Sequence, residues 1–296
     1  MALAPFLGLF ALGLLVGAFG TLIGAGGGFV LVPILLLLYP QESPQTITSI
    51  SLAVVALNAG SGTLGYHRLR RIDYAAGLRF AAATVPGALA GAGVNYLLDR
   101  AAFNAVFGGI LVLVGGYLLL GSGGEVASRS LLRPDVQVTL TDAAGETYRY
   151  AYNRWLGLAL SVLVGFLSTL LGIGGGIVHV PVMAEILGFP VHIATATSHF
   201  VLAVTALVGT AVHLATGEFR HGWRRTAALG CGVVLGAQLG ARLSHRVHGS
   251  LILRLLGLAL LLVGLRLAAG VLLSLAPFPI SHVLVPRSAL TMGGRT

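Results

Sequence analysis

A glycine-rich stretch that occurs twice constrains this chain more than any other feature. Residues 24–33 read Gly-Ala-Gly-Gly-Gly-Phe-Val-Leu-Val-Pro and residues 172–181 read Gly-Ile-Gly-Gly-Gly-Ile-Val-His-Val-Pro, so seven of the ten positions are identical. Each copy follows a long apolar run and precedes a shorter one, which indicates an apolar helix that is interrupted and then restarted. In hydrocarbon an unpaired backbone group is costly, so such a break survives only where it is buried in protein or lines a cavity.

The composition indicates that the surroundings are lipid. Hydrophobic residues make up 56% of the 296 residues and charged residues only 9%, and the mean hydropathy is +0.93. These values exclude an ordinary soluble domain. The net charge of +9 comes from arginines that lie mainly in short loops beside apolar segments. Orientation in the membrane and contact with anionic lipid explain that pattern better than nucleic acid, which we do not expect as a partner.

Ten apolar segments form two matched sets of five. About 20 helical residues are needed to span a bilayer, so residues 27–39 and 175–188 are predicted to be half-helices. Gly24 and Gly172, 148 positions apart, and His67 and His213, 146 positions apart, predict a duplication. We therefore expect an all-α polytopic membrane protein with two repeats of about four transmembrane helices each, each repeat with a glycine-broken half-helix. The expected divisions are a first repeat at 1–121, a polar linker at 122–153, a second repeat at 154–276 and a C-terminal tail at 277–296.

The arginines also bear on orientation. If a glycine break and its half-helix together add one crossing, each repeat crosses four times, and the loop arginines divide twelve against three. If every apolar segment crosses, the division is nine against six and the repeats are inverted. Cytoplasmic loops carry the excess of arginine and lysine. The first arrangement is therefore favoured, with both termini and the central loop in the cytoplasm.

The polar linker contains one patterned region. Val136–Thr141 and Thr147–Tyr152 alternate in hydrophobicity on either side of a segment that contains Gly145, which predicts a β-hairpin. An isolated hairpin is only marginally stable, so we expect it to pack on the helices. A structural role as a linker is favoured, and a regulatory or partner-binding role is the alternative.

A helix that restarts after a glycine run is suited to bind an anion. Its first N–H groups have no partner within the helix, and the helix dipole makes that end positive. Glycine permits the positive φ that the break requires and leaves the N–H groups accessible. Helix packing is the alternative explanation for these glycines. The predicted substrate contacts here are Gly26, Gly27, Gly28, Gly174, Gly175 and Gly176.

Hydroxyl groups are concentrated after each half-helix, at residues 46–51 and 195–198. Capping of the next helix accounts for one or two of them, and the others can donate to an oxyanion. The predicted substrate contacts in these segments are Ser49, Ser51 and Asn58 in the first repeat and Thr195, Thr197, Ser198 and His199 in the second.

Ionisable side chains at membrane depth are functional candidates by default. His179, His199 and Glu185 are the candidates for carrying a coupling proton, and a neutral buried histidine with one hydrogen bond is the alternative for the first two. The chain has no HExxH or CxxC motif, no phosphate-binding loop and no carboxylate pair. We therefore predict no enzymatic activity, no catalytic residue, no metal site and no cofactor.

The second glycine stretch, together with residues 189–200 (Phe-Pro-Val-His-Ile-Ala-Thr-Ala-Thr-Ser-His-Phe), resembles the TauE/SafE family, also called the toluene-sulfonate uptake permeases. The first repeat matches the pattern more loosely, with Thr-Ser-Ile-Ser at 48–51. The resemblance covers nearly the whole chain. It implies an inner-membrane carrier of about eight spans, built from a duplicated four-span unit, that moves sulfite, sulfonates or related small anions, often outward. It does not fix the substrate, the direction or the coupling ion.

Together these features predict a secondary transporter that binds a small sulfur-containing anion between the two glycine breaks and works by alternating access. Export is the favoured direction. Two other classes remain open. A passive anion channel would line its pore with the same donors. An accessory membrane subunit of a sulfur-metabolising enzyme would have a partner protein. The sequence does not indicate the oligomeric state.

Overall fold

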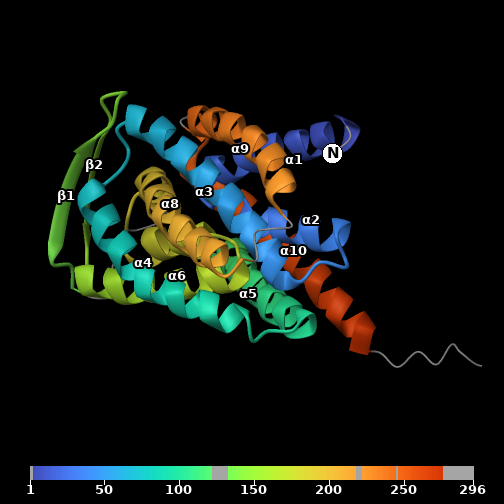
Figure 1. The fold of residues 1–296 in the computed structure, drawn as a ribbon. Helices are drawn as coiled ribbons and strands as arrows, with labels where there is room; N and C mark the ends of the chain where they lie inside the picture. The colour runs from blue at the N-terminus through green and yellow to red at the C-terminus, as the bar shows by residue number, and fades with distance from the viewer. Residues whose placement is uncertain (1–2, 122–132, 218–221, 245, 276–296) are drawn as a thin grey trace, which may run out of the picture.

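A computed structural model describes residues 3–121, 133–217, 222–244 and 246–275. Figure 1 shows a body of helices with a β-hairpin along one end. Six of the described helices are long and apolar enough to cross a membrane. The predicted helical membrane fold with a small hairpin is therefore confirmed. The elements are α1 (Leu3–Leu22), α2 (Gly28–Leu38), α3 (Pro44–Arg68), α4 (Tyr74–Asn95), α5 (Arg100–Gly121), β1 (Val136–Thr141), β2 (Thr147–Tyr152), α6 (Arg154–Leu171), α7 (Gly176–Pro181), the π-helix η1 (Val182–Ile186), α8 (Val191–Ala215), α9 (Trp223–Ser244) and α10 (Gly249–Leu275).

The two half-helices are present. Helix α2 has 11 residues, which is a length of about 16 Å. The second half-helix consists of α7 with 6 residues and η1 with 5. The change to a π-helix directly follows Pro181, whose ring lacks an N–H and crowds the carbonyl one turn back. Each half-helix begins after a glycine in the left-handed region, Gly27 at φ 80° and Gly175 at φ 84°.

Two helix pairs are in backbone contact at glycines. Any side chain at Gly232, Gly236 or Gly240 of α9 would overlap a carbonyl oxygen of α1. Gly87 and Gly91 of α4 lie equally close to carbonyl oxygens of α6. These contacts follow the small-xxx-small pattern of membrane helices. Each pair joins one helix from the first half of the chain to one helix from the second half. An inverted duplication would produce such an exchange of helices between the halves. The duplication itself stays a prediction.

Helices α3 and α8 run antiparallel through the centre of the body. Gly62 of α3 contacts His199 near the start of α8, and Leu52 near the start of α3 contacts Gly209. Both helices are buried along most of their length. Helices α5 and α10 form a further antiparallel pair, with Gly115 against Leu261 and Gly264 against Val112.

The contacts between helices also show which helix ends lie at the same end of the body. Helix α1 runs parallel to α9, whose last turn lies beside Gly65 at the end of α3. The next residues after α3 carry the hairpin, because Ala143 N donates to Leu69 O. The first residues of α1 therefore lie at the end of the body opposite the hairpin, as Figure 1 also shows. The same holds for the last described residues of α10, since α10 runs antiparallel to α5.

The described ends of α1 and α10 thus lie opposite the hairpin, which favours the alternative arrangement, and the cytoplasmic side of both termini and the central loop stays a prediction. Helix α1 is a nearly full-length helix, and α2 returns the chain to the end where α1 began. Arg100 at the start of α5 donates to the carbonyls of Leu36, Pro40 and Glu42, and so fixes the end of α2 at that level. The half-helix is short, but together with its linker it completes the return. This geometry corresponds to the alternative arrangement of nine arginines against six.

The hairpin has the predicted strands, with Val136 opposite Tyr152 and Thr141 opposite Thr147. It packs on the helical body as expected. Tyr150 and Tyr152 are buried against Phe80 and Phe189. The hydroxyl of Tyr150 also donates to Asp73, which caps α4.

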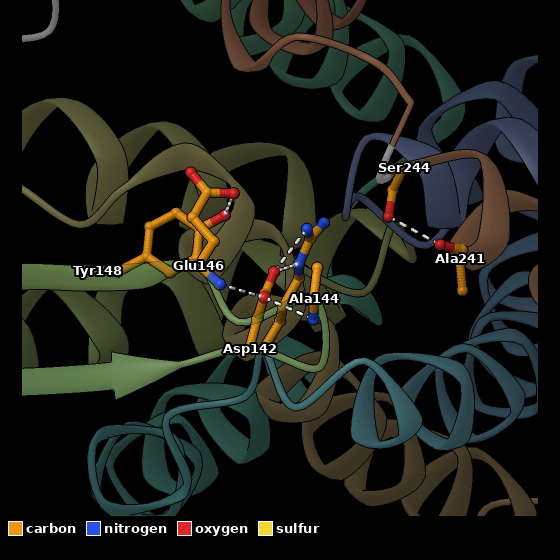
Figure 2. A network of polar contacts seen from close by, with 7 residues as sticks. Asp142, Ala144, Glu146, Tyr148, Ala241 and Ser244 are labelled. Atoms are coloured by element: carbon orange, nitrogen blue, oxygen red, sulfur yellow. Dashed lines mark hydrogen bonds and ion pairs between the residues drawn. The ribbon is translucent and has the colours of Figure 1, made fainter.

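A buried ion pair fixes the turn of the hairpin. Arg71 donates from both Nε and Nη2 to Asp142, at 3.0 and 2.8 Å. Figure 2 shows Asp142 also accepting from the backbone of Ala144 and Glu146. Burial raises the pKa of Asp142. The hydrogen bonds to its charged form lower the pKa by more than burial raises it, so the pKa lies below the ordinary value of an aspartate. The turn is therefore held by a carboxylate that stays charged at neutral pH.

Candidate functional site

The two glycine turns are in contact with each other at the centre of the body. Gly28 lies against the backbone of Ile173, and Gly176 lies against the backbone of Gly24 and Ala25. In both cases an added Cβ would come within 3 Å of backbone atoms. The restarting ends of α2 and α7 therefore meet in a small, fully buried region.

Three consecutive N–H groups at the start of each half-helix have no hydrogen-bond acceptor among the described residues. They belong to Gly27, Gly28 and Phe29 at α2, and to the matching residues 175–177 at α7. All six residues are buried. The turns before them are closed by their own bonds, such as Ala25 N to Gly20 O and Ile173 N to Ser168 O. Six buried donors without acceptors in one region are what an anion site requires.

Two side chains of α3 hold the carbonyl groups of the turns. Ser51 Oγ donates to Gly172 O at 2.6 Å, and Asn58 Nδ2 donates to Gly26 O at 3.0 Å. The Asn58 amide oxygen in turn accepts from Thr21 at 3.2 Å. Helix α3 therefore positions both turns at once, through polar groups that are all buried.

Three polar atoms of α8 are different, because they are buried and have no hydrogen-bond partner. They are Thr195 Oγ1, Ser198 Oγ and His199 Nδ1. Residues three and four positions apart share one face of a helix, so the three side chains lie together. Thr195 contacts Gly24 of the first glycine turn, and Nε2 of His199 lies 3.3 Å from the hydroxyl of Thr21. This face supplies hydroxyl and imidazole groups beside the first glycine turn.

Apolar side chains of α3 and α8 also pack against the two turns. Any side chain at Gly26 or Gly174 would meet both Val55 and Leu202. These two side chains fill the space next to Gly26 and Gly174.

Two other predicted residues have local partners. Ser49 Oγ donates to Thr46 O of its own helix. Thr197 accepts from the backbone N–H of Asp73, so it ties the start of α8 to the start of α4. Both side chains are fully buried. Their observed bonds are structural.

His179 and Glu185 lie on the second half-helix and face other helices. The His179 ring packs against Phe80 of α4 and lies 3.5 Å from Ser161 of α6. Glu185 is in η1 and has a buried carboxylate oxygen without a partner. His199, in contrast, is bonded to the group that precedes the first glycine turn.

Sequence reasoning missed several polar groups around the turns. Thr21 bonds both Asn58 and His199, and the Tyr66 hydroxyl donates to Thr21 O. Ser168 has an unpartnered hydroxyl beside Gly175. A usable signal was the match of Thr21 to Thr169 at the repeat spacing of 148. No cluster of metal-ligating side chains occurs among the described residues.

Comparison with known proteins decides the family. The family model described as Sulfite exporter TauE/SafE matches residues 9–267. The chain belongs to this family. It is 34% identical to the "Probable membrane transporter protein YunE" of Bacillus subtilis over 268 residues, which are 88% of this chain and 97% of the relative. No solved structure matches the chain.

More distant relatives carry similar names. A "Probable membrane transporter protein" of Methanocaldococcus jannaschii is 26% identical over 211 residues, 70% of this chain and 71% of the relative. One of Xylella fastidiosa is 36% identical over 110 residues, 36% of this chain and 41% of the relative. The chain is thus a multi-pass membrane transporter of the TauE/SafE family.

Proposed function

We propose that this transporter is a secondary carrier, acting in export, for a small anion of the sulfite or sulfonate type. The observation that supports this most directly is the group of six buried N–H donors without acceptors where α2 and α7 begin. A sulfur oxyanion has several acceptor oxygens that can be satisfied together by such donors. The description of the matching family as sulfite exporters agrees with this substrate class and direction.

The α8 face would complete the site. Thr195 and Ser198 each have a hydroxyl without a partner, and a hydroxyl donates to an anion at little cost in desolvation. Removing an anion from water is unfavourable, and several N–H and O–H donors offset that cost. We expect the anion to displace Val55 and Leu202 from their position between the turns.

Alternating access fits the way the half-helices enter. The α1–α2 pair enters and leaves at one end of the body, and the pair formed by α6 with α7 and η1 enters and leaves at the other. Two half-helices that enter from opposite ends and meet at one site would give the anion a separate path from each side of the membrane. Rocking of helix pairs would then open one path while closing the other.

We further propose that the protein lies in the inner membrane with the hairpin end in the cytoplasm. Among the described residues, eight arginines in loops or at element ends belong to the hairpin end and three, Arg100, Arg224 and Arg225, to the opposite end. The excess favours a cytoplasmic hairpin. The first residues of α1 and the last described residues of α10 would then be on the outer face.

His199 is our candidate for the coupling proton. Its side chain lies 3.3 Å from Thr21, next to the first glycine turn, and against Gly62 of α3. A change of its charge would alter the field where the anion binds. His179 and Glu185 are secondary candidates, because their contacts lie elsewhere.

Flux measurements test the proposal. The purified protein in proteoliposomes should move radiolabelled sulfite or a sulfonate in a saturable manner, and a pH gradient should drive the flux uphill. Thr195→Val should reduce the flux at least tenfold. Thr210→Val is the matched control on the same helix, because Thr210 only donates to Ala206 O.

Other outcomes would exclude the carrier. Flux that never saturates and only runs downhill would indicate a channel. Absence of flux for sulfite, thiosulfate, a sulfonate and chloride, in a correctly folded protein, would contradict transport of a small anion at this site.

A further inference from the structure

A groove on the outer surface of the first half-helix carries features that the transport site does not use. It has a volume of about 420 Å³ and lies between α2, α5 and α10. Its apolar lining includes Val30, Pro33, Leu37 and Leu262. Leu37 and Leu262 are more than half exposed, so the groove opens on the surface that faces lipid.

Part of the lining of the groove is polar and positively charged. Arg100, Asn104 and Arg266 line it. Arg100 is half-buried and donates to three carbonyls at the end of α2, so its position is fixed and its charge is not neutralised by those bonds. Arg266 is exposed, and no salt bridge or hydrogen bond from it occurs among the described residues.

The acidic groups nearby are already engaged. Glu42 pairs with Arg225 at 2.8 Å. Asp99 accepts from the backbone of Ala102 at the start of α5. The groove therefore keeps an excess of positive charge.

Asn104 adds a second, independent indication of a ligand. Its amide oxygen is buried and has no hydrogen-bond partner. A buried acceptor without a donor is unfavourable. A ligand with a hydroxyl beside its negative charge would satisfy the amide and the arginines together.

A matched groove on the other half of the molecule lacks these features. It has a volume of about 300 Å³ and is lined by Val178, Pro181 and Val182 of the second half-helix and by residues of α5. Tyr117 stands there at the position that Arg266 has in the first groove, 149 residues later. Its lining contains no cation. The charge is thus a property of one groove and not of both.

We infer that the groove between α2, α5 and α10 binds an anionic phospholipid with a hydroxyl-bearing headgroup, of which phosphatidylglycerol is the simplest. One acyl chain lies along Val30, Pro33 and Leu37, the phosphate contacts Arg266 and Arg100, and a headgroup hydroxyl donates to Asn104. Basic pockets between membrane helices bind such headgroups by this combination of charge and apolar contact. The lipid would pack on the outer face of the half-helix whose N-terminus enters the candidate anion site.

Native mass spectrometry of the full chain tests this inference. The protein is mixed with equal amounts of dioleoyl phosphatidylglycerol, phosphatidylmethanol and phosphatidylcholine, which differ in charge and in headgroup hydroxyls. We expect phosphatidylglycerol to be retained most, about fivefold above phosphatidylmethanol, since one hydrogen bond separates the two. Phosphatidylcholine should be retained least. This part of the test needs no variant.

Variants then locate the site. Arg266→Gln should lower the retention of phosphatidylglycerol about fivefold. Arg224→Gln, which removes the same charge from an exposed position at the same end of the body, should not. Asn104→Leu should abolish the preference over phosphatidylmethanol.

Three results would overturn the inference. Equal retention of all three lipids would remove the basis for a headgroup site. Equal losses in Arg266→Gln and Arg224→Gln would reduce the effect to general attraction. A dimer that holds no lipid and dissociates in Arg266→Gln would identify a second copy of the chain as the occupant.

Discussion

The two central helices carry matching residues that form different hydrogen bonds. Ser51 of α3 and Ser198 of α8 stand 147 positions apart, close to the repeat spacing, as do Thr48 and Thr195. Ser51 and Thr48 both donate to carbonyl oxygens. Ser198 and Thr195 are equally buried but have no partner. Matching positions thus stabilise the fold on α3 and leave donors open for a ligand on α8.

The largest expected effect is that of Asn58→Leu. This change removes the donor to Gly26 O and the acceptor for Thr21, and it leaves both groups buried. Each unsatisfied group costs about 1–3 kcal/mol, so unfolding should become easier by about 2–5 kcal/mol. Thermal unfolding in detergent measures this loss of stability. A stability equal to that of the unchanged protein would mean that α3 does not hold the turns.

The matched pair Ser51→Ala and Ser198→Ala sharpens the comparison directly. Ser51→Ala should lower stability by about 1 kcal/mol, because Gly172 O loses its donor. Ser198→Ala should change stability by less than about 0.5 kcal/mol, because no bond is lost. Its sulfite flux should nevertheless fall about tenfold. If the two variants lose stability equally, α8 is as structural as α3.

His199→Gln tests the imidazole of the same face. Glutamine can keep the contact with Thr21 but cannot take up a proton, so flux should continue without responding to a pH gradient. The stability loss should stay near 1 kcal/mol. His213→Gln is the control, since His213 is a buried histidine on the same helix, near Tyr96 at its far end. A gradient response lost in the control and kept in His199→Gln would reverse the assignment.

The smallest effect is expected at the hairpin, which links the end of α3 to the start of α8 through Asp73. The folded-state pKa of Asp142 lies below 3.8, so its ion pair stabilises the docked hairpin at neutral pH. That contribution is lost as the pH falls through the lowered pKa of Asp142. Near-ultraviolet circular dichroism should report the release of Tyr150 and Tyr152.

Asp142→Asn provides the comparison for the acid transition. The variant should show a weaker tyrosine signal at neutral pH and no further change on acidification in this range. An unchanged acid transition in Asp142→Asn would assign the titration to another group.

Local pattern was enough to predict much of the fold. The half-helices followed from apolar length and the hairpin strands from alternation around Gly145, because both signals are contained in the segment itself. The position of the first residues of α1 opposite the hairpin could not be predicted. It depended on whether α2 with its linker reaches back to Arg100, and that is a tertiary contact.

The candidate site was predictable only in part. A run of hydroxyls does not reveal which of them bond their own helix, as Ser49 does, and which point at another element. Thr21 and Tyr66 were missed because each stands alone in an apolar segment, and their roles arise from contact with His199 and Asn58. The role of the predicted residues in transport stays a prediction.

The glycine contacts of α1 with α9 and of α4 with α6 have a consequence for how the chain can be divided. Each half gives one helix to a partner in the other half, through surfaces where backbone meets backbone. In the proposed alternating-access mechanism, the two halves of the sequence would therefore not move as two separate bodies. A chain cut within residues 122–132 would yield two fragments that behave as subunits of one complex. Alone, each fragment would expose glycines that normally contact the other fragment. Neither would form a working half-carrier. Co-expression, not separate purification, is the way to recover them.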